Sequence, residues 1–542
     1  MRPVRAREAT FRDERETFPM IVRISQLNLP PEYSPRQLLQ AAARALRSNP
    51  EALSNLTTVR RSIDARGRSP RITVTADVTF SGTLRRRDRN VREIEPQSPP
   101  PPLVRAPHNG PRPLVVGAGP AGLMAALALA ESGRKPLLIE RGEATGPRAA
   151  RVTGFWKQGT FDRESNVLYG EGGAGLFSDG KLTSRSKDRP RIRRFFETLV
   201  ACGASPDILI DAEPHLGSDV LEALVPALRH RIESLGGEVR FGTRFERLEI
   251  EDGAVRGAVF AEETFRTDCC VLATGHSARD IYRMLAEQGV PLEQKPFAVG
   301  VRLEIPQPRI DTAQWGGPFP ALGSASFRLT RREEGDARSC YSFCMCPGGL
   351  VIACASSEGL LTTNGMSLSK RDLPFGNAGF LVPVRPDDFP ADSVPVLAGI
   401  EFQRRMEAAA FAAGGSDYSL PAQRLTEFLA EATPSALPTE RSCTRARPAA
   451  LREVLPEFVA DTLTQALPKM LRGLRGVVLD EGLLYAGETR SSSPVRVLRG
   501  EDSQSTGLRG LYPCGEGSGY AGGIVSSGLD GLRIAEAILT AG

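Results

Sequence analysis

Short apolar runs and helical stretches alternate in the middle of the chain, which is the pattern of a parallel α/β fold. Residues 114–116 form an apolar run of buried-strand type, and an Ala- and Leu-rich segment of helical composition follows to about Ser132. Gly133 ends this predicted helix. A second apolar run, 136–139, then ends at the acidic residue Glu140. The pattern predicts a βαβ unit over 113–140.

Later segments are predicted to return to the same sheet. We expect a long helix over 215–235 with Gly236 and Gly237 as its C-cap, strands within 238–260, and a buried strand at 270–275. A strand at 510–513 and a helix over 522–539 follow much later. One nucleotide-type domain would therefore be built from two separate parts, 113–290 and 471–542.

The region before this domain has its own pattern. A strand (21–27), a helix that follows Ser34 as N-cap and Pro35 at its first position, and a hairpin (56–64 and 71–80) predict a small N-terminal α/β domain over 20–95. Residues 1–19 lack an apolar segment and are expected to form a mobile arm. The run PQSPPPP opens a stiff Pro-rich linker at 96–112.

Residues 291–470 read as an inserted α+β substrate domain. Strand-like segments at 297–305, 339–346 and 349–355 precede helical segments at 399–413 and 423–430.

The first βαβ unit contains a dinucleotide fingerprint, Gly117-Ala118-Gly119-Pro120-Ala121-Gly122. Gly117 would allow the tight turn, Gly119 the approach of a pyrophosphate to the helix N-terminus, and Gly122 close packing of helix and strand. Glu140 lies eighteen residues after Gly122, where its carboxylate can bind a ribose diol and disfavour a 2′-phosphate. The expected ligand is FAD or NAD. The bare pattern also occurs at 170–175 and 517–522, but without the flanking strand, helix and acidic residue.

Composition and charge limit the other classes of function. The longest apolar runs are too short to span a bilayer, and nine scattered cysteines are typical of reduced thiols in a cytoplasmic protein. Four histidines and a single close pair, Cys344 and Cys346, predict no metal site. We interpret the pair as buried structural thiols, with a redox role as the alternative.

The net charge of +5 is unevenly distributed. Residues 1–105 carry 20 Arg against 11 Asp and Glu, so RNA, an acidic protein or the chain's own FAD domain are candidate contacts. Because the whole chain has 62 Arg and only seven Lys, this excess favours a solvated surface over a nucleic-acid site.

Several segments together resemble a known family. They are SNVLYGEGGAGLFSDGKL (165–182), VLATGHSARD (271–280), KPFAVGVRLE (295–304), YSFCMCPGG (341–349), ETRSSSPV (488–495) and YPCGEGSGYAGGI (512–524). These resemble the mostly uncharacterised bacterial and plastid FAD-dependent dehydrogenases within the glutathione-reductase-like superfamily. The resemblance covers about residues 20–542. It implies a Rossmann-like FAD-binding domain, with FAD as the cofactor.

The resemblance also assigns residues to the cofactor. It places the FAD pyrophosphate on the first glycine loop, the ribose on Glu140 and Arg141, and the adenine against the backbone of Phe245. Glu516 stands where such flavoproteins usually have Asp, on the ribityl chain. The other implied FAD contacts are Glu171, Gly172, Gly173, Ala174, Gly175, Ala273, Thr274, Gly275, Gly515, Gly522, Gly523 and Ile524, the last three through amides that would point at flavin N1 and O2.

The catalytic residues are only weakly indicated. Lys181 is a rare Lys in an Arg-rich chain, so we hypothesise that a compact ammonium group is needed there; an exposed Lys is the alternative. His276 follows the ATG turn as a candidate proton donor or a structural His. Arg490, beside three serines, would bind an anionic substrate group or fix a loop.

These patterns favour an FAD-dependent dehydrogenase or reductase that transfers hydride through flavin N5. No second complete βαβ fingerprint exists, so NAD(P)H would act as a transient electron donor, if it acts at all. An FAD-dependent monooxygenase is the alternative enzyme. An RNA-associated flavoprotein or redox scaffold that uses the basic N-terminal module is the alternative of another class. The sequence gives neither the small-molecule substrate nor the oligomeric state.

Overall fold

The computed structural model describes residues 20–67, 69–84, 89–95, 110–332, 338–391 and 394–541. The expected mobile arm and positions 96–109 of the expected linker lie outside these residues. The chain forms two compact units, Met1–Pro99 with Ile210–Ala212, and Pro100–Leu209 with Glu213–Gly542. The first division falls within the expected linker. The further division of the larger unit at 290 and 470 stays a prediction.

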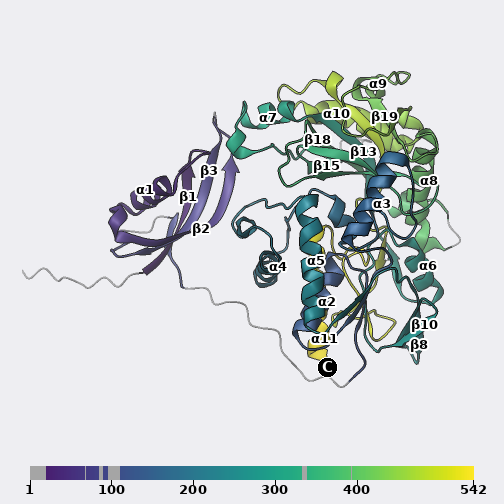
Figure 1. Ribbon diagram of the computed structural model, residues 1–542. Coiled ribbons are helices and arrows are strands. Elements are labelled where there is room, and N and C mark those ends of the chain that lie inside the picture. Colours follow the sequence, from purple (N-terminus) through teal and green to yellow (C-terminus); the bar gives the residue numbers. More distant parts are fainter. Residues whose placement is uncertain are drawn as a thin grey trace, which may run out of the picture. The chain divides into compact units, whose positions relative to one another are not determined.

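The small unit is an antiparallel sheet with one helix. Its strands are β1 (Met20–Leu29), β2 (Leu53–Asp64), β3 (Arg71–Phe80) and β4 (Val91–Glu93), in the order β2-β3-β1-β4. Alternate β3 side chains from Ile72 to Phe80 are buried, and helix α1 (Pro35–Leu46) lies against the sheet (Figure 1). As predicted, Ser34 caps α1: its Oγ accepts from the amide of Gln37 at 3.3 Å.

A five-stranded parallel sheet is the centre of one half of the large unit. Its order is β23 (Leu511–Pro513), β11 (Cys270–Leu272), β5 (Leu114–Val116), β6 (Leu137–Ile139) and β7 (Glu238–Arg240). The middle residues of β5, β6 and β11 pack against one group of helices, and the outer residues pack into a second core on the opposite face. This confirms the predicted Rossmann-like α/β arrangement.

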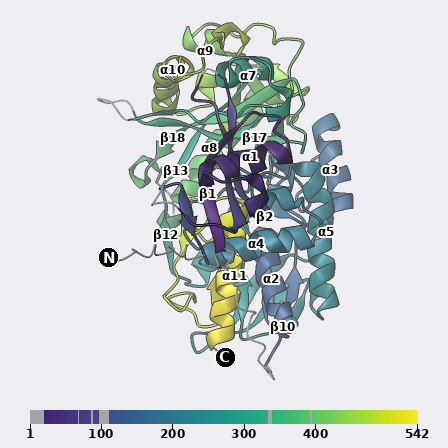
Figure 2. The same cartoon turned by 90° about the vertical axis from the view of Figure 1, so that its left-hand side faces the viewer.

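Two different layers cover this sheet. The helices on one face are α2 (Pro120–Glu131), α4 (Arg189–Ala201), α5 (Ser218–Ser234) and α11 (Ile524–Ala541). Figure 2 shows α2 and α11 running alongside each other, and a Cβ on Gly531 would lie 2.1 Å from the carbonyl oxygen of Ala121. The other face packs against α6 (Arg279–Glu287) and the antiparallel strands β8 (Phe245–Glu251), β9 (Ala254–Phe260) and β10 (Glu263–Arg266).

A seven-stranded mixed sheet organises the other half. Its order is β14 (Thr330–Arg331), β15 (Cys340–Cys346), β18 (Phe375–Val384), β13 (Phe297–Pro306), β21 (Leu483–Glu488), β19 (Leu420–Arg424) and β20 (Ala446–Pro448). The odd-numbered side chains of β13 from Phe297 to Ile305 join an apolar core. The even-numbered Arg302 and Glu304 are buried on the opposite face with polar partners.

The remaining elements pack around both sheets. The helices are α3 (Thr145–Gln158), α7 (Gln307–Trp315), α8 (Ala398–Ala413), α9 (Leu425–Leu429) and α10 (Glu457–Leu471), and the two-stranded pairs are β16 (Gly349–Cys354) with β17 (Thr362–Ser367) and β12 (Leu292–Gln294) with β22 (Val495–Val497). The predicted helix at 423–430 is wrong over its first residues, since 420–424 form β19 in the sheet. Across the described ranges, no helix has the length and apolar character needed to cross a membrane.

Candidate functional site

The first glycine loop turns tightly between β5 and α2. Gly117 has φ of +103°, and a Cβ there would lie 2.5 Å from the carbonyl oxygen of Ala273. A Cβ on Gly122 would lie only 1.8 Å from the carbonyl oxygen of Gly117. These two glycines therefore have the turning and packing roles predicted for them.

The carboxyl edge of the parallel sheet brings distant glycine segments together. A Cβ on Gly517 would lie 2.5 Å from the carbonyl oxygen of Gly275. A Cβ on Gly173 would lie 3.2 Å from the Cα of Gly119, and one on Gly175 would lie 3.1 Å from a side-chain carbon of Ile524. The loops 117–122, 172–175, 273–275 and 515–524 thus meet at one place, which is the arrangement that the resemblance implied.

Several glycines at this place face open space. Added Cβ atoms on Gly275, Gly522 and Gly523 would meet no other atom of the described chain within 4 Å, and the nearest atom to one on Gly119 would be 3.9 Å away. Gly119 is also the N-cap of α2. A surface without Cβ atoms beside a helix N-terminus suits the close approach of a dinucleotide pyrophosphate. The residues present therefore fit FAD.

Glu140 holds the glycine loops in position. Its carboxylate is buried and accepts hydrogen bonds from the amides of Ala118 (2.8 Å), Gly142 (3.0 Å) and Gly170 (3.0 Å). The carboxylate therefore organises the backbone of the site. Its contact with a ribose diol stays a prediction.

Three other residues predicted to contact FAD have side chains that are paired with, or buried against, other parts of the protein. Glu171 is fully buried, where its carboxylate accepts from the amide of Thr145 at 2.9 Å and pairs with Arg229 at 2.7 Å, so its side chain orders the start of α3. Arg141 pairs with acidic side chains and stacks on the ring of a tyrosine 4.3 Å away. The Phe245 side chain is buried in the core, which leaves only its backbone for adenine.

Glu516 lies at the base of the final loop. Its carboxylate accepts from the amide of Gly523 at 3.4 Å, while the amide of Gly522 donates to the Oγ of Ser526 at 2.9 Å. Two of the three amides predicted to point at the flavin, those of Gly522 and Gly523, therefore donate to side chains of the protein. Burial raises the pKa of Glu516 to about 7, against the lowering effects of the Gly523 amide and the Lys295 charge.

We expect Glu516→Gln to change the pH dependence of stability in FAD-free protein. An acid whose folded-state pKa is raised favours folding while it is protonated, and this contribution is lost as pH rises from about 4.5 to about 7. The stability of wild type relative to Glu516→Gln should fall by about 2 kcal/mol across that window. Urea unfolding of both proteins at pH 5 and pH 8 measures this. An equal difference at both pH values would show that the pKa is ordinary.

His276 lies beside Glu516, with Nε2 3.9 Å from Oε1. Burial and the charges of Arg490, Arg279 and Lys295 lower the pKa of His276 to about 3. The ring is thus neutral at physiological pH, which argues against an imidazolium proton donor. Its Nδ1 is buried without a hydrogen-bond partner among the described residues.

Arg490 belongs to a buried ionic cluster that sequence reasoning did not find. Glu407 accepts two hydrogen bonds from Arg490 (2.7 and 3.1 Å) and two from Arg279 (2.8 and 2.9 Å). Burial alone would raise the pKa of Glu407, but the two arginines lower it to about 2. Ser491 bonds the backbone of Ala298. These contacts fit the loop-fixing alternative for Arg490.

Lys181, which follows the glycine segment 170–175, contacts β15. Its Nζ lies 2.6 Å from an oxygen of Asp179 and donates to the carbonyl oxygen of Met345. Arg371 holds the same Asp179 at 2.9 and 2.5 Å. Lys181 is therefore not the isolated exposed residue of the alternative interpretation, and its catalytic role stays a hypothesis.

A second buried ion pair was also missed. Arg302 contacts Glu488 through two hydrogen bonds, at 2.7 and 2.6 Å, and Asn377 at 2.8 Å. The sequence carried one signal for it, because Arg302 and Glu304 are the charged residues of a mainly apolar strand. A charged side chain in a buried strand needs a partner.

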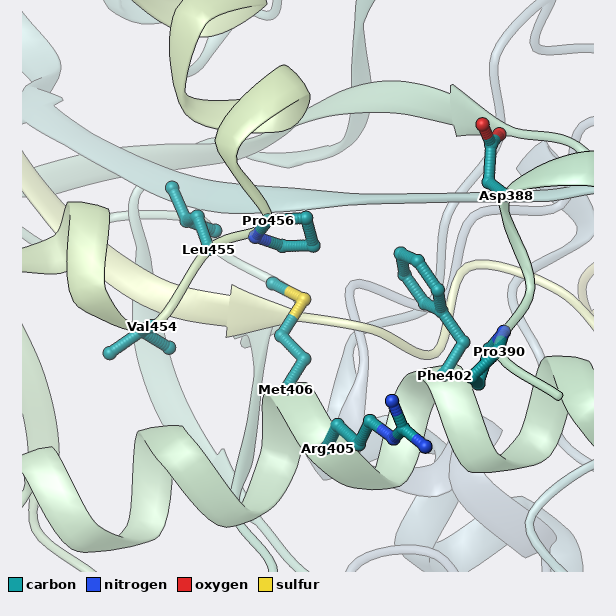
Figure 3. Close-up of a pocket in the computed structure, with 8 residues that line it drawn as sticks. All are labelled: Asp388, Pro390, Phe402, Arg405, Met406, Val454, Leu455 and Pro456. Atoms are coloured by element: carbon teal, nitrogen blue, oxygen red, sulfur yellow. The ribbon is translucent and has the colours of Figure 1, made fainter. Parts of the chain in front are cut away.

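A cavity of about 390 Å³ lies in the other half of the large unit (Figure 3). Phe402, Arg405 and Met406 of α8 line it together with the segment 454–456 and residues near Asp388. None of the predicted cofactor residues lines this cavity, so it is separate from the glycine loops. The described residues contain no group of three or more His, Cys, Asp or Glu placed to hold a metal ion.

Comparison with known families agrees with this geometry. Residues 115–174 match the NAD(P)-binding Rossmann-like domain, residues 221–365 match the FAD dependent oxidoreductase family, and residues 296–491 match the FAD-dependent protein, C-terminal domain-like family. Residues 20–79 match a domain of unknown function, DUF8436. An uncharacterised protein of Clostridium beijerinckii is 39% identical over 541 residues, which cover 96% of this chain and 99% of the relative.

The chain belongs to this family of FAD-dependent oxidoreductases. FAD is its cofactor, and it is an enzyme. The match at 296–491 includes all seven strands of the mixed sheet, so this sheet corresponds to the region described as FAD-dependent protein, C-terminal domain-like.

The solved structures to which the chain is similar are more distant in sequence. A geranylgeranyl bacteriochlorophyll reductase-like protein of Thermoplasma acidophilum is 13% identical, with 79% of this chain and 78% of that chain covered and a TM-score of 0.34. An oxidoreductase of Methanosarcina mazei is 11% identical, with 78% and 100% covered and a TM-score of 0.33. Quinol fumarate reductase of E. coli is 14% identical, with 80% and 71% covered and a TM-score of 0.35.

Proposed function

We propose that this FAD-dependent oxidoreductase is a dehydrogenase or reductase that moves a hydride to or from a small-molecule substrate through flavin N5. The observation that carries the proposal is the convergence of the glycine loops 117–122, 172–175, 273–275 and 515–524 at the carboxyl edge of one parallel sheet. Bound FAD supplies the two-electron acceptor. The chain supplies its binding surface and a charged setting.

The proposed roles of individual residues follow from their contacts. Gly119, Gly522 and Gly523 would border the cofactor, because added Cβ atoms there would project into open space. Glu140 would fix the pyrophosphate loop through the amides that it binds. Glu516 would hold a proton near neutral pH and accept or donate a hydrogen bond to the ribityl chain.

The buried ionic cluster near the proposed site favours the reduced state of a bound cofactor. Arg279 and Arg490 share one carboxylate, Glu407, so this cluster has one excess positive charge, and neutral His276 lies between it and Glu516. A positive charge beside a site that accepts electrons stabilises the reduced, more negative state.

We propose the cytoplasm as the compartment and NAD(P)H as a transient electron donor.

Absorption spectroscopy tests the proposal. Purified protein should show flavin bands, and anaerobic addition of NADPH or NADH should bleach them if either nucleotide is the donor. Bands that persist would identify the substrate as the electron source, and rapid reoxidation by O₂ with substrate hydroxylation would identify a monooxygenase instead. Failure to bind flavin even after reconstitution with FAD would overturn the proposal.

A further inference from the structure

Cys344 and Cys346 lie in an irregular part of β15. The strand pairs regularly with β18 up to Phe343, and a bulge then separates Phe343 from Cys346. Cys344 has φ of +44°, in the left-handed region. The Sγ of Cys346 donates to the carbonyl oxygen of Cys344 at 3.3 Å. The bulge thus turns the Cys346 thiol back toward Cys344.

Basic side chains surround this bulge. Arg302 donates to the carbonyl oxygen of Cys344 at 3.1 Å, and Lys181 donates to that of Met345. The hydrogen bond from Cys346 lowers the pKa of Cys344 against the opposing effect of burial, and the Arg302 and Lys181 charges lower it further. A thiolate is the nucleophile in disulfide exchange.

Cys344 differs from the other seven cysteines outside the pair. All nine cysteines lie in the described chain, and burial raises the pKa of each of those seven: Cys202, Cys269, Cys270, Cys340, Cys354, Cys443 and Cys514. These seven are inert structural thiols of the kind expected in a reduced protein.

The bulge also borders the proposed FAD site. Lys181 connects the bulge to the loop that begins at Gly170 and packs on Gly119 and Ile524. The pair therefore lies next to the segments that would hold the flavin end of the cofactor.

We propose that Cys344 and Cys346 form a redox-active dithiol that exchanges two electrons with bound FAD. In the oxidising direction two S–H bonds break and one S–S bond forms, and the two electrons and two protons convert FAD to FADH₂. The reverse reaction reduces the disulfide, so the exchange balances without a third reactant. This inference rests on the proposed function only in naming FAD as the electron partner.

Anaerobic reductive titration of the holoprotein tests the proposal. Protein first oxidised with diamide and then desalted should consume twice as much dithionite per flavin as Cys344→Ser or Cys346→Ser, because the disulfide takes two electrons in addition to the flavin. Cys202→Ser, which removes a thiol outside the bulge, should behave like wild type. Alkylation followed by mass spectrometry should find the 344–346 disulfide only in the oxidised wild type and Cys202→Ser proteins.

The outcomes separate the two proposals. Equal dithionite consumption by all variants, with both thiols alkylated after every treatment, would overturn the dithiol proposal. Flavin absorption bands in the same samples would still support the proposed FAD site. A disulfide in protein that never binds FAD would overturn the exchange with flavin and the proposed function together.

Discussion

Gly122→Ala is expected to abolish FAD retention and to lower the free energy of unfolding by about 3 kcal/mol. The added methyl would lie 1.8 Å from the carbonyl oxygen of Gly117, so α2 has to move away from β5 and the glycine loop has to deform. Flavin content per protein and urea unfolding measure the two effects. Because the obstructing atom belongs to the backbone, no rotamer change relieves the clash.

Gly154→Ala is the matched control. Gly154 lies inside α3, and an added Cβ there meets no other atom of the described chain within 4 Å. Alanine should leave FAD content unchanged and stabilise the helix by about 0.5–1 kcal/mol. If Gly122→Ala retained as much FAD as this control, the close approach of α2 to β5 would not be needed for cofactor binding.

Glu407→Ala is expected to be the other severe substitution, with a loss of about 3–5 kcal/mol. It leaves the guanidinium groups of Arg279 and Arg490, whose side chains are 9% and 7% exposed, without their shared carboxylate. The two buried positive charges then repel each other, and no carboxylate compensates for the hydration that they lose on burial. Urea unfolding with a parallel measurement of flavin content checks the result.

Glu401→Ala is the control for Glu407→Ala. It removes a glutamate from the same helix without breaking the buried ion pairs of Glu407. Glu401 lies on the same helix, α8, and forms ion pairs with Arg404 and Arg405 at 3.6 and 3.3 Å near the surface. Such pairs contribute about 0.3–0.5 kcal/mol. Similar losses in the two variants would mean that the Glu407 cluster contributes little to folding.

The βαβ unit was predictable because its signals are local. Leu114 to Val116, the glycines and Glu140 lie close together in the sequence, between positions 114 and 140, and each has a separate steric or polar function. The buried strands β5 and β11 read as apolar runs for the same reason. The prediction that several glycine segments meet came from the resemblance, and the structure brings them together at one sheet edge.

The seven-stranded sheet was harder to predict because its members depend on distant partners. β13 pairs with β18 and β21, and the Arg302–Glu488 pair joins residues that sequence periodicity reads as polar interruptions. Helix α10 was not predicted, although five of its residues are buried at helical spacing: Val459, Leu463, Ala466, Leu467 and Met470. The Glu407 cluster needed α6, α8 and the segment after β21 to be placed together, which no local pattern gives.

The order of strands in the parallel sheet constrains how the protein matures. β23 pairs with β11, and β11 with β5, yet β23 is synthesised only after everything from β6 to β22. During translation the edge of β11 and the face of α2 that receives Gly531 therefore wait without their partners, and the loop with Glu516 is still absent. The proposed FAD site is therefore complete only after the late segment has been released and docked, and until then the unpaired edge of β11 is open to association with other chains.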